Sequence, residues 1–372
     1  MDAVKPNIAI VYDGFPHYRG GIIEELGHSE KFNYIFFSNS DYREQSIPLY
    51  QFNQNQKYYF TKSLSIGPLF IQWGFLKKIL EHKCKYCILL GNPYFLSFWI
   101  VTPILRLLGI KVLFWTHGWI NQNDRKLTTV YRNTFYRLAN HLLVYGNRSK
   151  AIGQTYGFLA SGITVINNCL DYETQKKLYS SLDHLSQAHL RSEFNLPPHS
   201  KIIICSARVT KKCRFDLLIR AVALINSSLP IHILIIGEGQ ELDNLKSLAQ
   251  ELYVSTTFYG PCYDELILAK LYKASDLTVS PGKVGLTAIH SMTYGTPVLS
   301  HDDMDSQMPE VETIVDHVTG ALFIKDSIES LSESINQWFI HHPIKPDRLC
   351  IQRIESFYTP KFQRLAIESA LI

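Results

Sequence analysis

The stretch from residue 280 to residue 323 constrains the fold more than any other part of the chain. It follows a short apolar run at residues 277–280 and passes through a Pro-Gly pair into a segment with helical periodicity at residues 286–293. A second short apolar run follows at residues 296–300. The order strand, glycine-containing loop, helix and strand predicts a βαβ unit, which places a helix N-terminus at the carboxyl edge of a parallel sheet.

The loop of this unit is a candidate anion site. Free backbone N–H groups at a helix N-terminus attract negative charge, and the helix dipole adds to this attraction. Gly285 has no side chain, so we expect a phosphate to approach the main chain around Val284, Gly285 and Leu286. A plain βαβ turn without a ligand gives the same pattern, and both interpretations stay open.

Composition bounds the class of protein. The 372 residues are enough for two domains with full hydrophobic cores, and 46% apolar with 19% charged residues indicates a globular chain. The net charge of +4 is small, so we expect no nucleic-acid partner, whereas anionic ligands are compatible with it. Seven scattered cysteines, mostly in apolar runs, indicate reduced core thiols in a cytoplasmic protein.

The N-terminal half alternates apolar strands and amphipathic helices. A strand at residues 7–12 leads into a loop that ends in Gly20 and Gly21, a pair that resembles a phosphate-approach loop. The full G-x-G-x-x-G spacing is missing, so a flexible turn is an open alternative. A later strand at residues 111–115 ends close to His117, at the edge where open α/β sheets bind ligands. A lone histidine is also often structural.

The domain organisation follows from a change in composition. Residues 1–170 form one α/β series, and a more polar stretch at 171–198 with Pro197-Pro198 predicts a linker. A second α/β series occupies residues 199–357, and a C-terminal helix at 358–372 is expected to complete the first domain. The pattern therefore predicts two Rossmann-like, doubly wound α/β domains that face each other across a cleft.

Nine landmarks in this order resemble the GT-B glycosyltransferases, and most closely the retaining nucleotide-sugar enzymes of glycosyltransferase family four. They cover about residues 7 to 323, and each is weak alone. The landmarks are Arg19-Gly20-Gly21, Thr116-His117-Gly118, Val165-Ile166-Asn167-Asn168, Ala207-Arg208-Val209, Gly237-Glu238-Gly239-Gln240-Glu241, Phe258-Tyr259-Gly260, Ala274-Ser275-Asp276, Gly285-Leu286 with Gly295-Thr296-Pro297-Val298, and Thr319-Gly320.

The resemblance implies a nucleotide-diphosphate sugar as the donor, held by the C-terminal domain, and an acceptor received by the N-terminal domain. Arg208 matches the diphosphate-binding arginine of the family, whose guanidinium fork suits paired phosphate oxygens. The family lysine five residues later is replaced by Cys213, and we expect Lys212 to take its place, with a solvated basic turn as the alternative. His117 matches a histidine that lines the donor-sugar pocket.

The remaining donor-binding residues are also carried over from the family. The main chain at Val284, Gly285 and Leu286 is expected to hold the distal phosphate, and Gly20 and Gly21 to close on the phosphates from the other domain. The landmark glycines Gly237 and Gly260 and the helix residue His290 complete the expected donor-binding set.

One departure from the family concerns its two glutamates, which have seven residues between them. Those positions are Gly282 and His290 here. The first glutamate contacts the donor sugar and the second the ribose hydroxyls, so His290 can still serve the ribose but Gly282 offers no carboxylate. The alternatives are a divergent active enzyme or a catalytically silent sugar-nucleotide-binding subunit, and an epimerase on the same fold is a third.

The family mechanism needs charge stabilisation on the departing phosphate, for which Arg208, Lys212 and His117 are the expected catalytic residues, and no separate base. We expect no cofactor and no metal, although Asp303 and Asp305 form a D-x-D pattern after a strand. Enzymes resembling this one build surface polysaccharides such as O-antigen or capsule, so we expect a saccharide or lipid-linked acceptor.

Membrane contact is a further expectation. The helical segments 70–78 and 93–108 carry aromatic and basic residues, including Trp73, Phe75 and Trp99, that favour a peripheral location at the inner face of the cytoplasmic membrane. An ordinary core role for these aromatics is the alternative.

Overall fold

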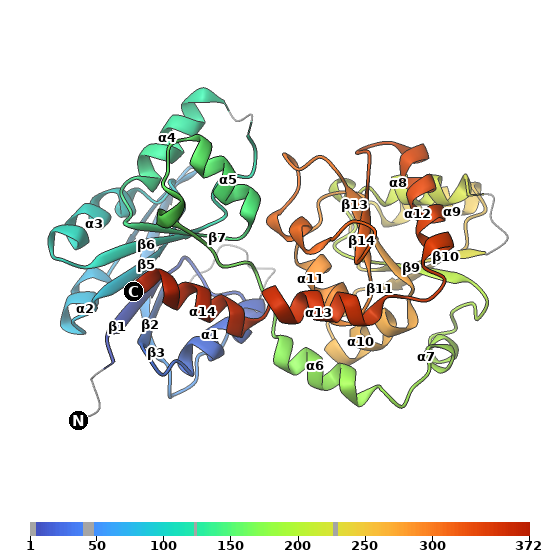
Figure 1. The fold of residues 1–372 in the computed structure, drawn as a ribbon, viewed down its shortest axis with the longest axis horizontal. Helices are drawn as coiled ribbons and strands as arrows, with labels where there is room; N and C mark the ends of the chain where they lie inside the picture. Colours follow the sequence, from blue (N-terminus) through green and yellow to red (C-terminus); the bar gives the residue numbers. More distant parts are fainter. Residues whose placement is uncertain (1–4, 40–47, 123–124, 226–229) are drawn as a thin grey trace. The chain divides into compact units, whose positions relative to one another are not determined.

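A computed structural model describes residues 5–39, 48–122, 125–225 and 230–372. The chain divides into two compact units, the first formed by residues 1–171 and 360–372 and the second by residues 172–359. Each unit is an α/β sandwich around its own sheet of parallel strands, with one antiparallel pair in unit 1 (Figure 1), so the predicted fold class of two doubly wound domains is confirmed.

The sheet of unit 1 has the strand order β4-β3-β2-β1-β5-β6-β7-β8, and all neighbours are parallel except β3 and β4. Its central strands are continuous apolar runs because helices cover both faces. The strands are β1 (Asn7–Val11), β2 (Asn33–Asn39), β3 (Lys57–Ile66), β4 (Leu69–Trp73), β5 (Tyr86–Leu90), β6 (Lys111–Thr116), β7 (His141–Val144) and β8 (Ile163–Val165).

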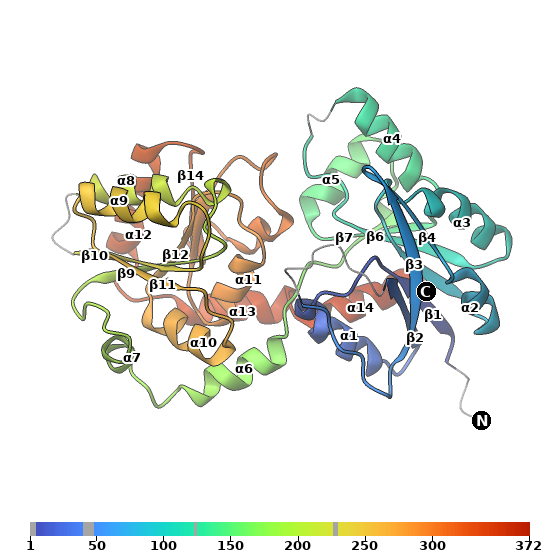
Figure 2. The ribbon, with the colours of Figure 1, turned by 180° about the vertical axis from the view of Figure 1, so that it is seen from behind.

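One face of this sheet packs on α2 (Leu76–Glu81), α3 (Leu96–Leu107), α4 (Lys126–Tyr136) and α5 (Asn147–Thr155). The other face packs on α1 (Gly20–Gly27) and on the C-terminal helix α14 (Pro360–Leu371). Figure 2 shows α1 and α14 side by side, although more than 300 residues separate them along the chain. Arg364 joins them through a hydrogen-bonded ion pair of 2.8 Å with Glu25.

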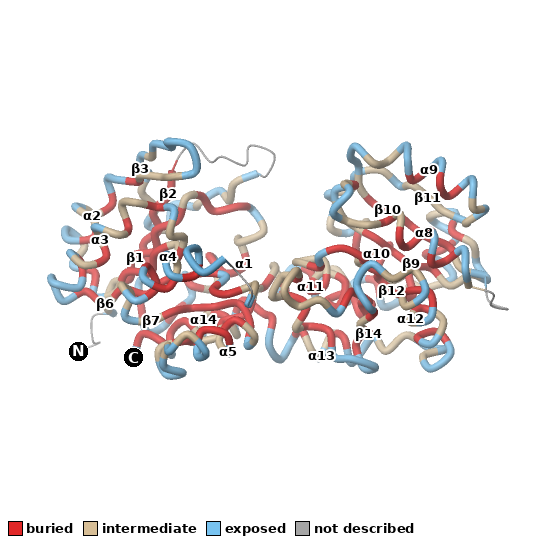
Figure 3. Tube along the Cα trace, turned by 90° about the horizontal axis from the view of Figure 1, so that it is seen from above, coloured by how far each residue is buried: buried red, intermediate tan, exposed pale blue. Residues whose placement is uncertain are grey.

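The sheet of unit 2 has the order β11-β10-β9-β12-β13-β14 and is parallel throughout. In Figure 3 the buried residues of each unit follow the strands, and the outer helices and loops are exposed. The strands are β9 (Lys201–Ser206), β10 (Ile231–Ile236), β11 (Thr256–Gly260), β12 (Leu277–Ser280), β13 (Val298–His301) and β14 (Gly320–Phe323).

The faces of this sheet carry two sets of helices. The helices α8 (Phe215–Ala223), α9 (Leu242–Glu251) and α12 (Ile328–His341) share one core with the sheet, and α7 (Gln187–Glu193) and α10 (Glu265–Ala274) share another. The helix α11 (Leu286–Thr293) follows β12, and α13 (Asp347–Phe357) packs against it. Two short 3-10 turns, η3 (Lys211–Cys213) and η4 (Pro309–Thr313), lie in loops of this unit.

The polar composition of residues 171–198 predicts a linker, but the structure forms α6 (Tyr172–Ser181) and α7 there, and both pack on α10. These two short helices contain few buried side chains, and most of their residues are polar. Arg191 of α7, for example, is buried because it donates hydrogen bonds to the Ala274 carbonyl and to Asp276. Polar residues that are satisfied by long-range partners look like linker residues in the sequence.

Candidate functional site

Four loops meet at the carboxyl edge of the unit 2 sheet, after β9, β10, β11 and β12. The first two are joined closely, because the Val209 N–H donates to the Glu238 carbonyl at 2.8 Å. A Cβ atom at Gly237 would lie 2.0 Å from the Ala207 oxygen, and one at Gly239 would lie 2.1 Å from the Val209 oxygen. Glycine at both positions therefore serves this backbone contact, which makes the loop around residue 208 rigid.

Arg208 is presented by that rigid loop. Its side chain is exposed and forms no hydrogen bond or ion pair with any described residue. The thiol of Cys213 donates to the Arg208 carbonyl at 3.0 Å, so the cysteine at the family lysine position closes the turn. An uncompensated guanidinium on a fixed backbone is suited to an anionic ligand.

The amides of the predicted phosphate loop are only partly free. The Val284 N–H donates to the Gln307 side chain at 2.9 Å, so this amide is occupied and the expectation for Val284 is corrected. The N–H groups of Gly285, Leu286 and Thr287 at the start of α11 bond to no described residue. A Cβ atom at Gly285 would meet no described atom within 4 Å, so open space lies in front of this loop.

Gly282, where the family has its first glutamate, has a steric explanation. A Cβ atom there would lie 2.0 Å from the Lys212 carbonyl oxygen and 3.1 Å from the Cys213 Cα atom. The Gly282 N–H also donates to the Cys213 carbonyl at 3.1 Å. The η3 turn thus occupies the space that a glutamate side chain would need. The Lys212 side chain itself is exposed, and it forms no hydrogen bond or ion pair within the described residues.

His290 lies one turn into α11 and binds a carboxylate that the sequence motifs do not indicate. Its Nε2 lies 2.7 Å from Oε1 of Glu265, the first residue of α10. The same oxygen accepts hydrogen bonds from Tyr294 at 2.5 Å and Gln175 at 3.0 Å. Burial opposes ionisation, but these donors outweigh it and lower the pKa of Glu265 to about 2. The only signal in the sequence is an acidic residue opening the helix after β11.

Gly260 is the last residue of β11, five residues before Glu265, and its backbone φ of +89° favours glycine. Its carbonyl accepts from the Gly237 N–H at 2.8 Å. The structure therefore brings together Arg208, Lys212, Gly237, Gly260, Val284, Gly285, Leu286 and His290 at one edge of one sheet.

The other expected residues lie in unit 1. His117 follows β6 and its ring lies 4.9 Å from the Tyr145 ring, which follows β7. Arg19 donates to the Tyr145 hydroxyl at 2.7 Å and lies over the Tyr12 ring. Although His117 is exposed at the surface, desolvation by surrounding atoms and the positive charge of Arg19 lower its pKa, so the ring is neutral at pH 7.

Gly20 and Gly21, the predicted phosphate loop, both make contacts within unit 1. The Gly20 N–H donates to the His17 carbonyl, because a 3-10 turn, η1 (His17–Arg19), precedes α1. A Cβ atom at Gly21 would lie 2.9 Å from the Cα atom of Asp171. Close packing of the chain after β8 therefore accounts for Gly21, and the Gly20 amide is already engaged.

The D-x-D pattern is held by protein contacts. Asp303 pairs with Lys325 at 2.7 Å, and hydrogen bonds from Lys325 and Ser306 lower the pKa of Asp303 to about 2. Among the described residues, no three histidine, cysteine or acidic side chains gather in a way that could hold a metal ion.

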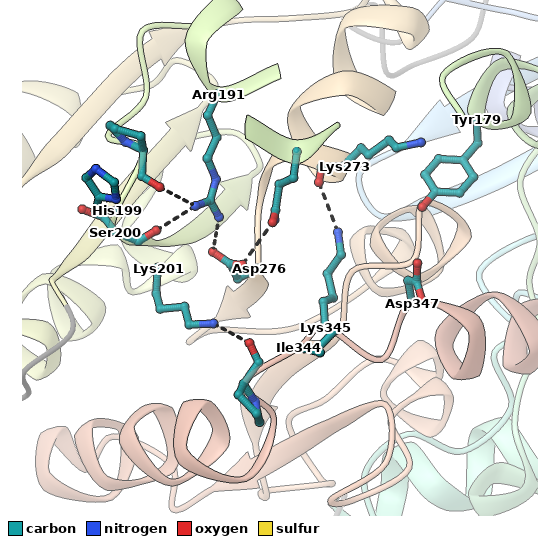
Figure 4. A pocket seen from close by; sticks show the side chains of 13 residues that line it. Tyr179, Arg191, His199, Ser200, Lys201, Lys273, Asp276, Ile344, Lys345 and Asp347 are labelled. Atoms are coloured by element: carbon teal, nitrogen blue, oxygen red, sulfur yellow. Dashed lines mark hydrogen bonds and ion pairs between the residues drawn. The ribbon is translucent and has the colours of Figure 1, made fainter. Parts of the chain in front are cut away.

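A hollow of about 460 Å³ lies at the opposite, amino edge of the unit 2 sheet. Figure 4 shows the Arg191 guanidinium directed at Asp276, with a distance of 2.6 Å, and Lys345 directed at the carbonyl of Lys273. The Lys345 ammonium also donates to the Ser275 carbonyl at 2.9 Å. These cations are saturated by the protein, so we interpret the hollow as a structural junction around the end of α10.

Comparisons with known proteins concern the fold and the sequence family. Residues 186–352 match the family model described as glycosyl transferases group 1. No curated protein matches the chain in sequence.

Solved structures match over the whole length. They include the lipopolysaccharide outer core galactosyltransferase WaaB in its apo form, with 17% identity and a TM-score of 0.71 over 98% of this chain and 99% of WaaB. A glycosyltransferase from Rickettsia africae ESF-5 has 16% identity and a TM-score of 0.73, covering 99% and 98%. Anabaena Alr3699/HepE in complex with UDP has 14% identity and a TM-score of 0.67, covering 98% and 99%. The chain therefore has the fold of the GT-B glycosyltransferases, and the match of its residues 186–352 to the glycosyl transferases group 1 model supports a glycosyltransferase.

Proposed function

We propose that the chain transfers a sugar from a nucleoside-diphosphate sugar to a saccharide or lipid-linked saccharide, with retention, in the synthesis of a surface polysaccharide such as lipopolysaccharide, O-antigen or capsule. The observation that carries the proposal is the free Arg208 guanidinium after β9 together with the free amides of Gly285, Leu286 and Thr287 after β12, the neighbouring strand. Two likenesses support it, because HepE was solved with UDP and WaaB is a lipopolysaccharide galactosyltransferase.

The chemistry follows from these groups. Negative charge develops on the diphosphate as it leaves, and a guanidinium fork with fixed amides stabilises it without reorganisation. Lys212 adds an exposed positive charge on the neighbouring turn. In unit 1, the Arg19 guanidinium and the neutral His117 ring offer hydrogen-bond donors and an acceptor, and we assign His117 to the donor-sugar pocket.

The burial of side chains in unit 1 shows which apolar residues are available for the expected membrane contact. Phe75 is buried, and Trp99 is half-buried and donates its ring N–H to the Pro93 carbonyl. Exposed apolar residues instead run along α3, with Leu107 88% exposed. Among the described residues, no helix combines the length and apolarity needed to cross a membrane. We propose that this α3 face contacts the inner face of the cytoplasmic membrane.

A liposome co-sedimentation assay tests the membrane contact. The Leu107→Ser variant should bind anionic vesicles more weakly than the unaltered protein, and Leu224→Ser, exposed on unit 2, should bind as before. Equal sedimentation of both variants contradicts the proposal.

The donor site is tested with Arg208→Gln. Charge-assisted hydrogen bonds to phosphate contribute about 1.5–3 kcal/mol each, so this variant should bind UDP about 10- to 100-fold more weakly in calorimetry. Its melting temperature should not change, because Arg208 has no described partner to lose. Arg220→Gln, an exposed arginine on α8, is the matched control. Unchanged UDP affinity in Arg208→Gln contradicts the proposal.

A second candidate is a sugar-nucleotide-binding subunit without transfer activity, and it is favoured by Gly282, where no side chain fits. Incubation with labelled UDP, GDP, ADP and CMP sugars separates the outcomes. Transfer or release of sugar supports the transferase, an isomerised donor indicates an epimerase, and tight binding without turnover supports the silent subunit.

A further inference from the structure

We propose that Glu265 is a donor-recognition residue, whose free carboxylate oxygen accepts a hydroxyl hydrogen bond from the ribose of the nucleoside diphosphate, beside His290. This inference rests on the proposed function, since it assigns a residue of the same site.

The carboxylate is oriented by three donors on one of its oxygens. Gln175 from α6, and His290 and Tyr294 from α11 and its C-terminal end, all bond to Oε1 at 3.0, 2.7 and 2.5 Å. The Tyr294 ring is fully buried and Gln175 is only 5% exposed, so two of these donors are fixed by the core. Three donors satisfy Oε1, and the direction of the second oxygen is thereby set.

The second oxygen, Oε2, is available to a ligand. It forms no hydrogen bond with any described residue and is not among the buried polar atoms, and the Glu265 side chain is 36% exposed. Because the group stays ionised at neutral pH, Oε2 can only accept hydrogen bonds. The ligand group that meets it must therefore be a donor, which excludes a phosphate and fits a hydroxyl.

His290 supplies a second acceptor next to it. Since an ionised carboxylate cannot donate, the hydrogen of the His290–Glu265 contact lies on Nε2 of His290, and in the neutral tautomer of that ring Nδ1 is an acceptor. Nδ1 bonds to no described residue and is not among the buried polar atoms. Two neighbouring acceptors are complementary to the two hydroxyls of a vicinal diol, and a nucleoside diphosphate carries such a diol on its ribose.

The place in the fold agrees with this assignment. Glu265 opens α10 after β11, and His290 lies on α11 after β12, so both face the same sheet edge as Arg208 and the Gly285 amide. A purely structural role, in which Glu265 only joins α6, α10 and α11, predicts a loss of stability without a change in ligand preference.

Calorimetric titration with UDP and with 2′-deoxy-UDP and 3′-deoxy-UDP separates these roles. The unaltered protein should bind UDP at least 10-fold more tightly than either deoxy analogue, because a missing hydroxyl leaves a polar group of the site unpaired. In Glu265→Gln the preference should fall to about 3-fold or less, mainly through weaker UDP binding. Should GDP be the tighter ligand, GDP and 2′-deoxy-GDP replace them.

Tyr294→Phe is the matched control. It removes one donor from Oε1 but leaves Oε2 in place, so it should lower the melting temperature and keep the preference for UDP. An unaltered protein that binds a nucleoside diphosphate without preferring the ribose form overturns this inference alone, as does a Glu265→Gln variant that keeps the preference. A protein that binds no nucleoside diphosphate overturns the proposed function as well.

Discussion

Substitution of Gly282 by alanine tests the steric explanation for the missing glutamate. The new Cβ atom would lie 2.0 Å from the Lys212 oxygen, about 1 Å inside the closest approach of about 3 Å that real Cβ atoms show. The η3 turn must move, and the 3.1 Å hydrogen bond from the Gly282 N–H to the Cys213 carbonyl is lost. Overpacking lowers the free energy of unfolding by about 1–3 kcal/mol, and loss of the hydrogen bond lowers it by about 1 kcal/mol. We therefore expect Gly282→Ala to lower the free energy of unfolding by about 2–4 kcal/mol in total.

The assay is thermal unfolding followed by circular dichroism. For a unit of this size 1 kcal/mol corresponds to about 2–4 °C, so the transition of unit 2 should fall by roughly 5–15 °C. Gly285→Ala is the control, because its Cβ atom meets no described atom within 4 Å, and its melting temperature should change by less than about 2 °C. Gly285→Ala should nevertheless weaken UDP binding, since the methyl group narrows the approach to the amides. Equal melting temperatures for Gly282→Ala and the unaltered protein would refute the steric reasoning.

Two further predictions concern buried charge and pH. Asp276→Asn removes the carboxylate that pairs with the buried Arg191 guanidinium at 2.6 Å, and loss of one charge of a buried pair lowers the free energy of unfolding by about 3–5 kcal/mol. The midpoint of urea unfolding should therefore be clearly lower than in the unaltered protein. An equal midpoint contradicts this role of Asp276. The pKa of Glu265 is lowered to about 2, so its ionised form contributes stability above pH 4.5 that is lost as the pH falls from 4.5 to 2. Chemical unfolding of Glu265→Gln should therefore depend less steeply on pH in this range than unfolding of the unaltered protein, and identical slopes would exclude the effect.

The elements of the fold follow closely from local sequence. Periodicity predicts a helix at residues 286–293 and strands at 111–115 and 201–205, and the structure has α11, β6 and β9 at these places, with boundaries that differ by one residue at most. Such elements are predictable because hydrophobic alternation along a few residues decides which face is buried. Polar segments are less predictable from the sequence. The helix α7 was not predicted because an arginine such as Arg191 is usually a surface residue, although here it is buried.

The candidate site, like the fold, is predictable from the sequence only in part. The sequence alone determined two α/β units and the chemistry of the loops after the strands, since a glycine-containing loop before a helix exposes backbone amides wherever it occurs. The tertiary structure decided which of those groups remain free, because Gln307 occupies the Val284 amide and the Lys212 carbonyl fills the space beside Gly282. It also placed Glu265 against His290 across 25 residues of chain. Contacts between residues so far apart in the sequence depend on how the helices pack on the sheet, so they cannot be predicted from a local sequence pattern.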